Sequence, residues 1–149
     1  MPNVGETAPD ADLLDTAGAP YRLSAAWAAG PALLVFYPGD DTAVCTRQLC
    51  EYRDHWGEFT RRGVAVVGIN PAGVDRHRGF RERHAFPFPI LADPTGACCQ
   101  AYGAAAWYGT RRLAVVVGVD GRIRAAVATL PFLKPSLAGL LDILDRAAG

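Results

Sequence analysis

Several features are scarce in this 149-residue sequence, and each absence narrows what the chain can be. It carries no excess charge, because 15 basic residues balance 15 acidic ones, so neither nucleic acid nor an anionic membrane is expected as the main partner. No apolar run is long enough to span a bilayer. The first six residues lack the basic and apolar regions of a signal peptide, which favours a cytoplasmic protein. No linker, repeat or low-complexity tract interrupts residues 1–149, so we expect a single domain.

Cysteine is also scarce, with four residues, and no two of them form a Cys-x-x-Cys pair. This absence argues against a thioredoxin-type disulfide reductase. The three histidines show no ligand spacing with each other, and the cysteine spacing fits no common zinc site. Thiols of a cytoplasmic protein stay reduced unless they are catalytic or bind metal. The cysteines are therefore the first candidates for chemistry.

The stretch around Cys45 organises the chain. The apolar run 33–37 is typical of a strand buried on both faces, and Pro38-Gly39 ends it. Asp40, Asp41 and Thr42 then stand where side chains could cap the start of a helix. Apolar and aromatic residues follow Cys45 with helical spacing, namely Leu49, Tyr52, Trp56 and Phe59. This pattern predicts an inward-facing cysteine in the first turn of a helix, just past a strand end.

That position favours a reactive thiol, because the partial positive charge of a helix N-terminus stabilises a thiolate. Cys50 stands five residues later, which in an intact helix is about 7.5 Å of rise and about 140° of rotation. The two Cα atoms would then lie beyond the roughly 7 Å limit for a disulfide. Cys45 and Cys50 can therefore bond only if the first turns unwind, which favours a redox pair over a structural disulfide.

Pro38, Thr42 and Cys45 match the Pro-x-x-x-Thr-x-x-Cys motif of the peroxiredoxins. The chain resembles this family over almost its whole length, including a Gly-x-x-Ala-Pro-Asp opening at residues 5–10, after which Ala11 replaces the usual Phe. Cys50 resembles the resolving cysteine of the bacterioferritin-comigratory type. The resemblance implies a thioredoxin-like fold and activity without a metal or prosthetic group.

The rest of the pattern agrees with an α/β fold. The predicted elements are a hairpin over 13–23, a helix over 42–62, a strand over 64–69, a helix over 74–85, an extended segment over 86–91, a helix over 95–102, a loop over 104–110, strands over 113–117 and 123–128, and a C-terminal helix over 137–144. Parallel and hairpin elements occur together, so we expect a central mixed sheet covered by helices on both faces.

The resemblance also implies roles for individual residues. Cys45 would be the nucleophile that a peroxide oxidises to sulfenic acid, and Cys50 would resolve it as a disulfide. Thr42 would bind the peroxide, and Pro38 would shield the site from water. Arg112, counted back from the turn at 120–121, would stabilise the thiolate and the charge that develops on the peroxide.

Some positions keep alternatives. Arg111 adjoins Arg112 and could also correspond to the active-site arginine of the family, but the count from the turn favours Arg112. Gln48 replaces a glutamate that is frequent in the family, which is expected to weaken the contacts with nearby arginines. Cys98 and Cys99 are interpreted mainly as buried small residues, with a backup resolving role left open.

The leading hypothesis is a thiol peroxidase that reduces hydrogen peroxide and organic hydroperoxides and is recycled by thioredoxin or a similar dithiol protein. By the resemblance it would be a monomer, with a dimer as the other option. A second hypothesis is a peroxide sensor that passes oxidation to a partner protein. A third is a noncatalytic thioredoxin-like binding module, which the intact reactive motif disfavours.

Overall fold

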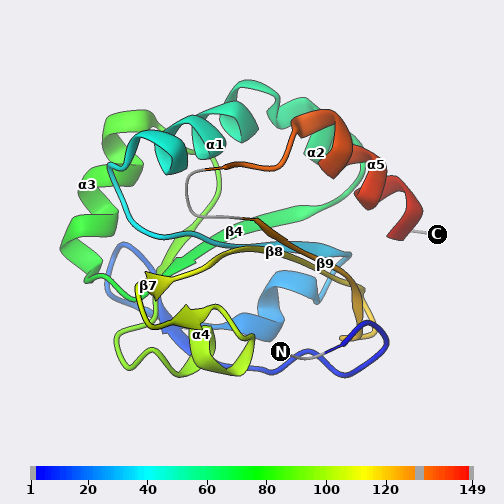
Figure 1. Ribbon diagram of the computed structural model, residues 1–149, viewed down its shortest axis with the longest axis horizontal. Helices are drawn as coiled ribbons and strands as arrows, with labels where there is room; N and C mark the ends of the chain where they lie inside the picture. Colours follow the sequence, from blue (N-terminus) through cyan, green and yellow to red (C-terminus); the bar gives the residue numbers. More distant parts are fainter. Residues whose placement is uncertain (1–2, 130–132, 148–149) are drawn as a thin grey trace.

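The computed structural model of the chain describes residues 3–129 and 133–147 (Figure 1). The strands are β1 (Asp12–Leu14), β2 (Pro20–Arg22), β3 (Ala32–Phe36), β4 (Ala65–Asn70), β5 (Ile90–Ala92), β6 (Ala105–Ala106), β7 (Gly109–Thr110), β8 (Arg112–Val117) and β9 (Ile123–Thr129). The helices are the short 3-10 helix η1 (Leu23–Trp27), α1 (Ala43–Asp54), α2 (Trp56–Arg61), α3 (Val74–His84), α4 (Ala97–Ala101) and α5 (Leu137–Ala147). None of the helices in these two ranges is long and apolar enough to cross a bilayer.

The predicted mixed sheet is confirmed, and it has the thioredoxin-like architecture. Its strand order is β2-β1-β5-β4-β3-β8-β9 within the part of the chain that the structure describes. The central strands β3, β4 and β5 are parallel, whereas β8 runs antiparallel to β3. All residues of β3 and β8 are buried, as continuous apolar runs predict for strands covered on both faces.

Helices cover both faces of the sheet and divide the core into two layers (Figure 1). One layer holds Leu33 and Val35 of β3 and packs against α1, α2, α3 and α5. The other holds Leu34 and Phe36 and packs against η1 and α4. Alternate residues of one strand thus face opposite layers, because side chains alternate across a strand.

The predicted helix over 42–62 is interrupted. It divides at His55, whose φ of −113° and ψ of 32° are not helical, into α1 and α2. The break lets aromatic rings pack on both sides of it: Trp56 lies 5.6 Å from the ring of Phe88, and Phe59 lies 5.4 Å from the ring of Tyr52. Tertiary packing therefore overrides a pattern that was continuous in the sequence.

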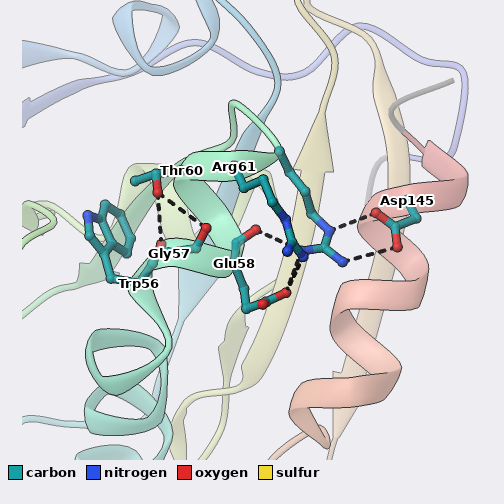
Figure 2. A network of polar contacts seen from close by, with 7 residues as sticks. Trp56, Gly57, Glu58, Thr60, Arg61 and Asp145 are labelled. Atoms are coloured by element: carbon teal, nitrogen blue, oxygen red, sulfur yellow. Dashed lines mark hydrogen bonds and ion pairs between the residues drawn. The ribbon is translucent and has the colours of Figure 1, made fainter.

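The short helix α2 is tied to α5 at the surface. The Arg62 side chain, just after α2, donates to both carboxylate oxygens of Asp145, at 2.7 and 3.2 Å, and also to Glu58. The Thr60 hydroxyl donates to the carbonyls of Trp56 and Gly57 (Figure 2). The C-terminal helix predicted over 137–144 is confirmed as α5 and extends further.

Two further segments differ from the sequence-based expectation. The predicted loop over 104–110 contains a small hairpin, β6 and β7, which turns at Trp107 and Tyr108. The predicted helix over 95–102 is shorter, because Gly96 has a φ of +72° that is outside the helical region. Pro131, which the sequence places in the connection before α5, lies outside the described residues.

Candidate active site

Cys45 occupies the position that its spacing predicts. It lies in the first turn of α1, after the loop that follows the C-terminal end of β3, and none of its surface is exposed. Leu49 and Tyr52 on the same helix face are also fully buried. The nucleophile candidate is therefore held rigidly between the helix and the sheet.

Arg112 lies next to Cys45. It is the first residue of β8, and β8 runs antiparallel to β3, with Leu113 paired to Phe36, so the start of one strand lies beside the end of the other. The Arg112 guanidinium is buried and donates from Nη2 to Cys45 Sγ at 3.2 Å. A cation at this distance stabilises negative charge on the sulfur.

The neighbouring arginine points elsewhere. Arg111 lines a surface pocket together with Tyr108, Ala128 and Thr129. Of the two arginines that the sequence offers, Arg112 is therefore the one that contacts Cys45.

Gln48 links Arg112 to α1. Its Oε1 accepts a hydrogen bond from Arg112 Nη1, and its Nε2 donates to the hydroxyl of Tyr52 at 2.9 Å. Burial raises the pKa of Tyr52 to about 12, so its hydroxyl stays protonated. Gln48 therefore keeps a contact with the guanidinium, but through a neutral amide oxygen in place of the charged carboxylate that is frequent in the family.

The loop before Cys45 differs in detail from the predicted capping. Thr42 has the extended backbone of an N-cap residue, but its hydroxyl donates to the carbonyl of Gly39 at 3.1 Å, and no side chain caps the helix. Asp40 and Asp41 bind other partners. Pro38, partly buried, begins this loop.

Asp40 belongs to a buried polar network that the sequence analysis missed. Its carboxylate accepts from the Tyr37 hydroxyl at 2.6 Å and lies 2.6 Å from Nδ1 of His77 on α3. Nε2 of His77 lies 3.0 Å from the Asn70 carbonyl, and the Asn70 amide donates to the Tyr37 carbonyl at 2.8 Å. All four side chains are buried. The network therefore fastens the loop that carries Thr42 to the ends of β3, β4 and α3.

A sequence signal for His77 did exist. It precedes Phe80 by three residues, which places the two side chains on one helix face. The helix predicted over 74–85 is rich in arginine and other charged residues, and this composition does not indicate that one of its histidines is buried. Burial holds the pKa of Tyr37 well above its ordinary value, and the nearby Asp40 carboxylate raises it further.

Cys50 and Cys45 lie on one continuous helix and both are free thiols. Cys50 is partly buried, and its Sγ lies 3.8 Å from Nδ1 of His84. Burial raises the pKa of Cys50, an effect that Arg53 opposes and Asp54 reinforces. The geometric reason for excluding a disulfide in the intact helix thus applies to this conformation.

Cys98 and Cys99 lie on the other side of the sheet. Both are buried in α4, within the layer that contains Phe36, whereas Cys45 belongs to the opposite layer. Burial raises the pKa of Cys98 to about 12 and that of Cys99 still further. A backup resolving role would therefore require one of these thiols to cross the sheet.

A sequence profile of the AhpC/TSA family matches residues 4–126. The chain belongs to this family, the peroxiredoxins. A putative peroxiredoxin of Mycobacterium tuberculosis is 36% identical to it, over 80% of this chain and 78% of the relative. A putative peroxiredoxin bcp of Coxiella burnetii is 39% identical over 71 residues, which span 48% of this peroxiredoxin and only 47% of the relative.

A solved structure shows the same fold. The peroxidoxin BcpB of Mycobacterium tuberculosis superimposes with a TM-score of 0.86 at 27% identity, covering 99% of this peroxiredoxin and 97% of that chain. The resemblance carried by Pro38, Thr42 and Cys45 is thus confirmed at the level of family and fold.

Proposed function

We propose that this peroxiredoxin is a thiol peroxidase that reduces hydrogen peroxide and organic hydroperoxides through Cys45. The observation that carries the proposal is the 3.2 Å contact between the buried Arg112 guanidinium and Cys45 Sγ. In the first step the Cys45 thiolate attacks the distal peroxide oxygen and the O–O bond breaks. Cys45 becomes a sulfenic acid, and the rest of the peroxide leaves as water or an alcohol after it takes up a proton.

Three neighbouring residues assist this step. Arg112 stabilises the thiolate and the charge on the departing oxygen. Thr42 donates its hydroxyl proton to Gly39, so its oxygen remains available to accept a hydrogen bond from the peroxide. Pro38 limits the access of water. Because no Cys45 surface is exposed, a peroxide reaches the sulfur through a small displacement of the loop that runs from Pro38 to Thr42.

The second step uses Cys50. After α1 unwinds at its N-terminal end, the Cys50 sulfur attacks the sulfenic acid and forms a Cys45–Cys50 disulfide with release of water. Thioredoxin or a similar dithiol protein then reduces the disulfide and restores both thiols. We place the protein in the cytoplasm and expect a monomer.

One single-turnover experiment tests the assignment. Reduced wild-type protein and a Cys50→Ser variant each receive one equivalent of hydrogen peroxide, and intact mass with disulfide mapping identifies the products. We expect a Cys45–Cys50 disulfide in the wild type and sulfenic or sulfinic acid at Cys45 in the variant. A Cys45 that stays reduced would refute the peroxidase and favour the binding module. Fast oxidation followed by slow turnover with thioredoxin would identify the sensor instead.

A further inference from the structure

A histidine touches the thiol that the proposed function assigns to the resolving step. His84 is the last residue of α3, and its Nδ1 lies 3.8 Å from Cys50 Sγ, within hydrogen-bonding distance for sulfur. Both side chains are partly buried. A neutral imidazole that carries its proton on Nε2 presents an acceptor at Nδ1. The Cys50 thiol can then donate its proton directly to this nitrogen.

The imidazole is held in place from several sides. Its ring stacks on Phe86, with centroids 5.4 Å apart and planes 25° from parallel, and it meets Phe80 edge-on at 5.3 Å. Arg53, one turn after Cys50 on α1, donates from Nη1 to the His84 carbonyl at 2.7 Å. The two aromatic contacts hold the ring within α3 and the segment that follows it, and the Arg53 bond fastens the His84 backbone to the second half of α1.

Cys50 needs such a partner. Burial raises the pKa of its thiol, so the protonated form dominates near neutral pH. Only a thiolate attacks a sulfenic acid efficiently. Arg53 and Asp54 are the charged groups that act on this thiol from its own helix, and their effects oppose each other. His84 is the group on the facing helix that can take the proton.

We propose that His84 is the general base of the resolving step, an inference that rests on the proposed roles of Cys45 and Cys50. The Cys50 thiol transfers its proton to His84 Nδ1, and its sulfur forms the S–S bond with Cys45. The S–O bond of the sulfenic acid breaks, and its hydroxyl oxygen takes up a proton from solvent and leaves as water. Cys50 is oxidised while the sulfenic acid is reduced, and His84 later returns its proton to solvent.

The same contacts indicate which part of α1 moves. The Arg53 bond to α3 retains residues 50–54 beside His84, whereas the first turns of the helix contain the sulfur that must travel. Unwinding of residues 43–49 would bring oxidised Cys45 to Cys50 while the base stays in contact with the attacking thiol. Helix ends unwind at lower free-energy cost than the interior of a fold.

The test separates the two steps of the cycle. Reduced wild type, His84→Phe and a His55→Phe control are mixed rapidly with one equivalent of hydrogen peroxide and quenched at intervals for mass analysis. Phenylalanine keeps the ring that packs on Phe86 and the backbone carbonyl that Arg53 binds, but it has no basic nitrogen. His55 is exposed and lies between α1 and α2, away from the Cys50–His84 contact, so its replacement controls for the loss of a histidine.

We expect His84→Phe to form the sulfenic acid at the wild-type rate but to form the disulfide about 100-fold more slowly, the scale of general base catalysis. Added imidazole should accelerate disulfide formation in His84→Ala. Disulfide formation by His84→Phe at the wild-type rate, or a slow His84→Ala that imidazole does not rescue, would overturn this inference alone. A wild-type chain whose Cys45 is oxidised but forms no disulfide with Cys50 would overturn the resolving role of Cys50 together with this inference, and a Cys45 that stays reduced would overturn the proposed peroxidase itself.

Discussion

The buried guanidinium of Arg112 makes the sharpest quantitative prediction about the first step. Replacing Arg112 with Met keeps much of the side-chain length and removes the charged donor that lies 3.2 Å from Cys45 Sγ. A hydrogen bond to a charged group is worth about 1.5–3 kcal/mol. If all of this energy is expressed in the transition state, the rate constant for oxidation of Cys45 falls roughly 10- to 150-fold.

Arg112→Lys should fall between the wild type and Arg112→Met. An ammonium keeps the positive charge but lacks the planar fork, so it cannot serve both Cys45 and the Gln48 amide in the way that Arg112 does. Arg111→Met is the matched control, because the adjacent guanidinium lies at a separate surface pocket.

The assay is stopped-flow measurement of the second-order rate constant for Cys45 oxidation by hydrogen peroxide. Thermal unfolding of each variant is recorded in parallel, because Arg112→Met also leaves the Gln48 oxygen without its buried donor, at a cost of about 1–3 kcal/mol in stability. An Arg112→Met protein that remains folded and oxidises within about threefold of wild type would refute the reasoning. An equal loss in Arg111→Met would show that the effect comes from any positive charge near the start of β8 and does not depend on the contact between Arg112 and Cys45.

Two further predictions concern groups away from the reacting sulfur. His77→Leu should lower the free energy of unfolding by about 1–3 kcal/mol, because it removes one of the two side chains that hydrogen-bond the buried Asp40 carboxylate and leaves only the Tyr37 hydroxyl. His77→Gln can still donate and should cost less; equal urea midpoints for His77→Leu and the wild type would contradict this prediction. For Cys98, burial raises the folded-state pKa to about 12, so the unfolded chain loses this proton first and stability should fall between about pH 9 and pH 12. Cys98→Ala should flatten that decline in urea titrations at several pH values, and an unchanged slope would count against it.

The sequence was most informative where one local pattern determined the outcome. A buried apolar run, a Pro-Gly stop and a helical repeat together placed Cys45 at the junction of β3 and α1. The position of Arg112 beside it was predicted only through the resemblance to the peroxiredoxins. The structure shows the reason for it, since Arg112 begins β8, which runs antiparallel to β3.

Features that depend on distant partners were not predictable in this way. The sequence places Asp40 at a helix cap because caps are local, but its partner His77 comes from α3, 37 residues later. The break at His55 follows from packing between Trp56 and Phe88, which no periodicity within the helix records. The hairpin that replaces the expected loop over 104–110 likewise needs pairing that a composition rich in small residues does not reveal.

The distance in sequence between Cys45 and Arg112 has a consequence for the synthesis of this protein. The two residues are 67 positions apart and meet only when β8 has paired with β3. During synthesis, Cys45 therefore lacks its contact with the Arg112 guanidinium for some time and resembles the other three cysteines of the chain. If Cys45 reacts with peroxide as proposed, its full reactivity arises only in a chain whose sheet is complete, so the order of assembly disfavours oxidation of incomplete or misfolded copies at this position.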